Sequence, residues 1–154
     1  MENITQIKNT ILAIVAGVGT FIAQELGGWD AGMKVLVGMM AADYITGVLI
    51  AMFWHKSRKT ENGTLDSRAG FKGLIKKCMI LLMVWIGVLL DESIGQDICR
   101  TAVILFFVGN EGLSLVENLA IMGVPCPQKV KGMLEAMHDE GDAGKSDRLT
   151  ESNK

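Results

Sequence analysis

Two acidic residues stand near the centres of apolar segments, where an ionisable group is costly. Asp43 lies within the segment 33–54, and Glu111 lies within the segment 101–122. At mid-depth in a bilayer, each ionised acid costs about 2.5–3.5 kcal/mol on insertion scales. Such a group has to be hidden, neutralised or turned toward water. Both acids are therefore candidates for a pore lining or for a conformational switch.

Glu111 has polar neighbours at helical spacing. At about 100° per residue, these neighbours share one arc of about 120° with Glu111, and the opposite side of the helix is apolar. Such a stripe suits a water-filled lumen, a seam between two helices, or a helix lying on the membrane surface. All three placements remain open. The members of the stripe besides Glu111 are Asn110, Ser114, Glu117 and Asn118.

Small residues recur at helical spacing in the first two apolar segments. Without bulky side chains, two helices can approach closely in lipid, which favours helix association. We therefore predict packing faces on both segments. The candidates are Ala13, Gly17 and Thr20 in the first segment, and Thr46 and Gly47 in the second.

Basic residues are concentrated between the second and third apolar segments. Residues 55–77 hold seven of the chain's 15 Lys and Arg. Within this stretch Arg68, Lys72 and Lys76 recur every four residues and Lys77 follows, with apolar side chains on the other side. This pattern predicts a basic amphipathic helix whose face of Arg68, Lys72, Lys76 and Lys77 lies on the inner leaflet. A solvated loop is the simpler alternative.

Four apolar blocks must position these residues: 7–26, 33–54, 71–90 and 101–122. None is an uninterrupted run of about 20 uncharged apolar residues, so a soluble bundle competes with short or tilted membrane spans. Residues 10–24 and 78–90 carry no charge on any face, and 154 residues cannot bury several such helices. We predict an all-α, oligomeric integral membrane protein with about four short transmembrane helices plus the basic cytoplasmic helix.

Charge placement predicts the orientation and the domain limits. The positive-inside rule puts the basic loop 55–77 in the cytoplasm, and four crossings then put both termini on that side. Residues 1–137 form the expected membrane domain. Residues 138–154 are polar and are expected to be a disordered cytoplasmic tail.

Several functions are disfavoured by composition and motif content. A net charge of -2 provides no basic field for nucleic acid. Cys78, Cys99 and Cys126 lack the spacing of a zinc site, and no nucleotide-binding or nucleophile motif occurs. We therefore expect no enzyme activity, no cofactor and no metal.

Four stretches in this order resemble the phage lysis and toxin-secretion holin family. The resemblance covers roughly residues 33–137 and implies a small protein of the bacterial cytoplasmic membrane that oligomerises and opens holes at a timed moment. It implies membrane lipids and other copies of the chain as partners. It also implies an endolysin or a toxin as released cargo, which need not bind. The stretches are ADYITG at 42–47, SRAGFKGLIKK at 67–77, NEGLSLVEN at 110–118 and GVPCP at 123–127.

Two other functions use the same helices. A small proton-coupled transporter would also place an acid at mid-span, and it would need an aromatic, ligand-sized pocket. A regulatory, antiholin-like protein would co-assemble with another pore former and would not permeabilise cells alone. Sequence does not separate the regulator from the pore former.

Overall fold

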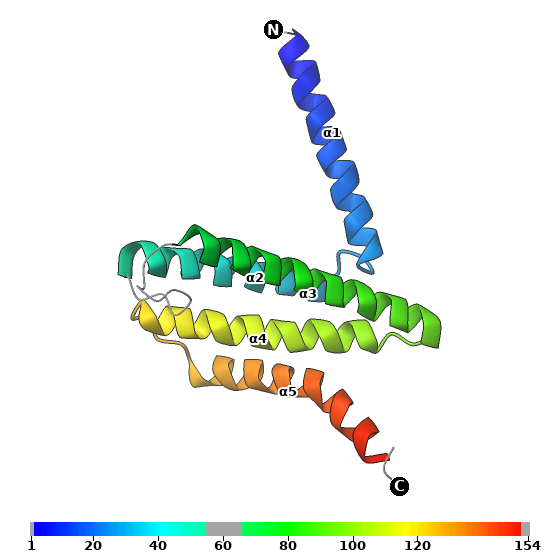
Figure 1. The fold of residues 1–154 in the computed structure, drawn as a ribbon, viewed down its shortest axis with the longest axis vertical. Coiled ribbons are helices and arrows are strands. Elements are labelled where there is room, and N and C mark those ends of the chain that lie inside the picture. The colour runs from blue at the N-terminus through cyan, green and yellow to red at the C-terminus, as the bar shows by residue number, and fades with distance from the viewer. Residues whose placement is uncertain (1, 55–65, 152–154) are drawn as a thin grey trace.

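The computed structural model describes residues 2–54 and 66–151, and over these residues the regular structure is helical throughout (Figure 1). Most of the expected basic loop, residues 55–65, lies outside the described residues, as do residues 1 and 152–154. A π-helical turn, η1, continues the second helix. The elements are α1 (Glu2–Glu25), α2 (Ala31–Leu49), η1 (Ile50–Trp54), α3 (Ser67–Ile94), α4 (Cys99–Ile121) and α5 (Gln128–Glu151).

Four of these helices are long and apolar enough to cross a membrane: α1, α2 with η1, α3 and α4. The prediction of an all-α fold with four potential spans is confirmed. Each helix begins a few residues before the block that its apolar pattern marked, because polar and small residues at the start continue the backbone hydrogen bonding without contributing to hydropathy. Only α3 also ends later than its block.

Three of the helices form the bundle that holds the polar residues of interest. Figure 1 shows α2, α3 and α4 side by side, with α4 in contact with both of the others. At Gly87 of α3 the helices approach so closely that an added Cβ would lie 2.9 Å from Cα of Arg100 in α4. The core between them is apolar and consists of Leu26, Met33, Leu36, Met40, Ile80, Val84, Ile104 and Val108.

Helix α1 stands apart from this bundle and projects away from it (Figure 1). Its apolar side chains are exposed around the whole helix, including Ile11, Val15 and Phe21. The chain turns between α1 and α2 at Gly27 and Gly28, whose φ angles of 80° and 97° favour glycine. A helix that is apolar on every side is suited to lipid contact.

Two expected segment types take a different form in the structure. The basic amphipathic segment is not a separate helix, because α3 runs without a break from Ser67 to Ile94. The segment expected to be unstructured from residue 138 is helical to Glu151, as the second part of α5. Residues 128–140 are rich in helix formers, and Leu134 is buried against α4. This tertiary contact stabilises a helix that composition alone did not predict.

Candidate functional site: a buried ion network

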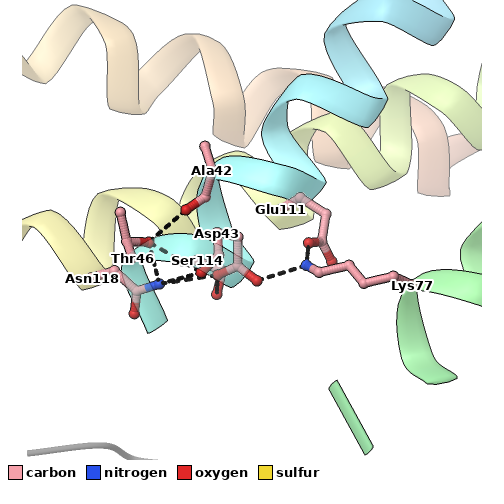
Figure 2. Close-up of polar contacts among 7 residues, drawn as sticks. All are labelled: Ala42, Asp43, Thr46, Lys77, Glu111, Ser114 and Asn118. Carbon is pink, nitrogen blue, oxygen red and sulfur yellow. Dashed lines mark hydrogen bonds and ion pairs between the residues drawn. The ribbon is translucent and has the colours of Figure 1, made fainter. Parts of the chain in front are cut away.

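Lys77 joins the two acids of the apolar segments in one ion network. Its Nζ lies 2.6 Å from Oδ2 of Asp43 and also pairs with Oε2 of Glu111 (Figure 2). The three residues come from α3, α2 and α4, and only 9% of Lys77 and 2% of each acid is exposed. The network therefore connects all three helices of the bundle close to the midpoint of each.

Asp43 is the most highly coordinated member of the network. Its Oδ1 accepts hydrogen bonds from Oγ of Ser114 at 2.7 Å and from Nδ2 of Asn118 at 3.1 Å. Asn118 also donates to Oγ1 of Thr46 at 3.0 Å, and that hydroxyl donates to the carbonyl of Ala42 at 2.8 Å (Figure 2). One α2 carboxylate is thus held by donors from both α3 and α4.

Helical periodicity explains why these side chains meet. In α2 the buried positions Met33, Leu36, Met40 and Asp43 follow a spacing of three and four residues. In α3 the corresponding row is Lys77, Ile80, Val84, Gly87 and Asp91. In α4 Glu111 follows Ile104 and Val108 on the inward side. Each charged residue therefore occupies a core position of its own helix.

The energetic balance of this network is asymmetric. Taking ions out of water costs several kcal/mol per ion, and a pair recovers this only with good geometry and further hydrogen bonds. Removing one partner leaves an uncompensated buried charge, which is far more costly than replacing the whole network with apolar groups. Because its three partners come from three helices, breaking one contact is expected to cost more than the intact network adds to stability.

A cavity of about 610 Å³ opens beside the network. Asn110 and Glu117, the two remaining members of the predicted polar stripe, line it, together with Tyr44, Lys72 and Lys76. The polar stripe is therefore only partly divided within one chain. Glu111, Ser114 and Asn118 bond to the other helices across a seam, whereas Asn110 and Glu117 line the cavity, which Glu111 and Ser114 also reach.

The predicted basic face is also divided. Arg68, Lys72 and Lys76 are exposed on the first turns of α3, whereas Lys77 is turned into the bundle. Lys77 is thus not on the surface where the sequence placed it. The reason is that it continues the inward row of Ile80 and Val84, about 100° around the helix from Lys76.

The predicted packing faces differ in what they contact. Thr46 takes part in the seam, and Gly47 next to it is partly buried on α2. Ala13, Gly17 and Thr20 lie on the exposed surface of α1. Within the described chain, and apart from the adjacent residues and nearby backbone of α1, no atom comes within 4 Å of a Cβ added at Gly17.

A second polar cluster, not predicted from the sequence, lies at one end of the bundle. It connects the α1–α2 turn with the α3–α4 turn. Arg100 pairs with Asp30 at 2.6 Å and donates to the carbonyls of Leu26 at 2.7 Å and Gly28 at 3.2 Å. The Asp91 carboxylate accepts from the backbone N–H groups of Ile98, Cys99 and Arg100, at 2.7–3.1 Å, and so caps α4. The Arg100 hydrogen bond holds the pKa of Asp30 below its ordinary value of 3.8.

The sequence of this helical bundle matches a known protein family. A model of the bacteriophage holin family matches residues 20–139. The chain belongs to the bacteriophage holin family. The match covers α2, α3 and α4 completely, and therefore both polar clusters. Membership in this holin family indicates a non-enzymatic membrane protein.

Several relatives align over most of their length. An uncharacterized 14.9 kDa protein in the nagH 3′ region of Clostridium perfringens is 34% identical over 142 residues, which is 91% of this chain and 99% of the relative. The uncharacterized protein Lmo0128 of Listeria monocytogenes is 36% identical over 121 residues, covering 78% and 81%. A probable holin of Bacillus phage phi105 is 31% identical over 111 residues, covering 71% and 76%. No solved structure matches this chain.

Proposed function

We propose that this holin oligomerises in the bacterial cytoplasmic membrane and forms timed pores. These pores would release an endolysin or a toxin during host-cell lysis or secretion. The observation that carries the proposal is the Asp43–Lys77–Glu111 network at the midpoint of three potential spans. A probable holin among the relatives supports the same function.

The network provides a closed state for a single subunit. Lys77 pairs with both acids and offsets one of their two negative charges, so the charged groups of the three helices are buried against one another rather than exposed to lipid. If helices separate or rotate during assembly, the same charged and polar side chains require water. Lining a common lumen would satisfy them, so the groups that hold the monomer closed would stabilise the open assembly.

The orientation that we propose follows from the basic residues of α3. Arg68, Lys72 and Lys76 are exposed at its start and would face the anionic inner leaflet, with both termini in the cytoplasm. Attraction to that leaflet contributes about 1 kcal/mol per basic residue close to the surface. The cavity beside the ion network would then open toward the cytoplasmic side.

Expression of the chain alone in bacteria tests the proposal. Membrane potential and escape of a folded cytoplasmic reporter protein are followed together after induction. We expect a delay, then abrupt depolarisation with escape of the reporter. Depolarisation without escape would limit the function to a small channel. No effect at verified membrane insertion would contradict autonomous pore formation and favour an antiholin-like regulator.

A further inference from the structure

Helix α5 occupies the α4 surface next to the ion network, although it is too polar to be a potential span. Leu134 is buried against Gly112, and the ring of His138 stacks on that of Phe106 with centroids 4.5 Å apart. Figure 1 shows the first turns of α5 running along α4 and its last turns leaving it. The two helices thus form an antiparallel hairpin.

The contact reaches the middle of α4 at backbone distance. A Cβ added at Gly109 would lie 2.6 Å from the backbone N of His138 and 2.7 Å from the carbonyl oxygen of Leu134. Gly109 is adjacent to Asn110, close to the midpoint of Cys99–Ile121. His138 therefore lies at the same level along the bundle axis as the middle of α4.

The outer side of α5 is charged over the same length. Lys131 and Glu135 are exposed and form an ion pair at 3.7 Å, and Asp139 and Glu140 are exposed directly after His138. If α4 crosses the bilayer completely, docked α5 would carry these charges into the hydrocarbon region. Exposed carboxylates at that depth are strongly disfavoured.

We propose that α5 is an intramolecular clamp, because docking of α5 on α4 and full insertion of α4 into lipid exclude each other. While α5 is docked, the part of α4 that packs against α5 remains in contact with water. When α5 leaves, α4 can insert fully into the bilayer. The effect of the clamp on lysis timing rests on the proposed pore function, whereas the docking itself does not.

A matched pair of glycine substitutions tests the clamp. Gly109→Ala forces the α5 backbone away from α4, whereas Gly132→Ala on α5 places its methyl group where nothing lies within 4 Å. At equal amounts in the membrane, we expect Gly109→Ala to shorten the delay before depolarisation at least twofold and Gly132→Ala to match the wild type. An unchanged or longer delay for Gly109→Ala overturns the proposal.

A second substitution covers the case in which Gly109→Ala fails to accumulate. Phe106→Ala removes the stacking on His138 without any backbone overlap. A shortened delay is again expected, and an unchanged or longer delay again contradicts the clamp.

Crosslinking measures the docking without relying on pore formation. Leu113 and Glu135 face a common cleft between α4 and α5, so Leu113→Cys with Glu135→Cys provides a reporter pair after Cys78, Cys99 and Cys126 are replaced by alanine. With a short, membrane-permeant bismaleimide, we expect Gly109→Ala to reduce the crosslinked fraction several-fold relative to Gly132→Ala. Equal fractions refute the clamp. A wild-type chain that crosslinks but never permeabilises cells refutes only the proposed pore function.

Discussion

The two polar clusters of the bundle use similar residues at different places along the helices. The network of Asp43, Lys77 and Glu111 is built from helix faces at mid-span and is almost completely buried. The cluster around Arg100 is built at helix ends, and 49% of the Asp30 side chain in it is exposed. Water can replace a lost partner at the helix ends, but it cannot do so at mid-span without opening the bundle. The ion pair at the helix ends therefore acts as a structural connector, whereas the network at mid-span is a candidate switch.

The largest difference between the clusters is expected for Lys77→Met. The substitution leaves two carboxylates buried beside each other, and breaking a buried pair in this way costs about 3–5 kcal/mol. Chemical unfolding of the purified protein in detergent micelles measures the loss. The triple variant Asp43→Asn, Lys77→Met, Glu111→Gln is the control, because it neutralises the whole network and is expected to recover most of the stability. Wild-type stability for Lys77→Met alone would show that Lys77 does not pair with Asp43 and Glu111 in the membrane protein.

Glu111→Gln should have a smaller effect, because Lys77 keeps Asp43 as a partner at 2.6 Å. A hydrogen bond to a charged group contributes about 1.5–3 kcal/mol, which is the expected loss. The control is Glu92→Gln in α3, where the side chain is exposed and a change of about 0.5 kcal/mol or less is expected. Equal effects of the two substitutions in the micelle unfolding assay would argue against a special role for the buried acid.

In the second cluster, the largest effect should come from Asp91→Ala. Ile98 stands at the N-cap position of α4 and makes no side-chain cap hydrogen bond, so the carboxylate of Asp91 satisfies the first N–H groups from the preceding helix. Loss of a helix cap costs about 0.5–2 kcal/mol. The neighbouring exposed residue provides the control as Glu92→Ala. Hydrogen exchange at the first turn of α4 should increase only in Asp91→Ala, and protection that persists there would contradict the capping role.

The smallest effect is expected for Asp30 and is visible as a dependence on pH. Arg100 lowers the pKa of Asp30 in the folded protein below 3.8, so this ion pair stabilises the fold above pH 3.8. The contribution is lost as the pH falls from 3.8 through the lowered pKa. Micelle unfolding between pH 5 and 2 should show this acid-dependent loss in the wild type and less of it in Asp30→Asn. Identical pH profiles would mean that the exposed pair contributes nothing measurable, as many surface ion pairs do.

Much of this protein was predictable from hydropathy and charge alone. Apolar blocks predicted the helices that can span a membrane, because the length and composition of a span are local properties. Asp43 and Glu111 stood out for the same reason, since an acid inside an apolar block can be recognised from the sequence alone. The polar stripe of α4 followed from the helical period, and three of its members lie in the seam around Asp43.

The tertiary structure alone decided which groups compensate the acids and which surface α5 covers. Lys77 belongs to a basic run by sequence, and its spacing of three to Ile80 and seven to Val84 was the available sign that it points inward. That spacing predicts an inward position but no partner. The partner is known only once α2 and α4 place Asp43 and Glu111 beside Lys77. Likewise, α5 is polar by composition, and its docking depends on the absence of a side chain at Gly109 and on the shape of the α4 surface around it. The sequence determines which charged residues need a partner or water within a membrane. Which partner each of them has is decided by the distances between the folded helices.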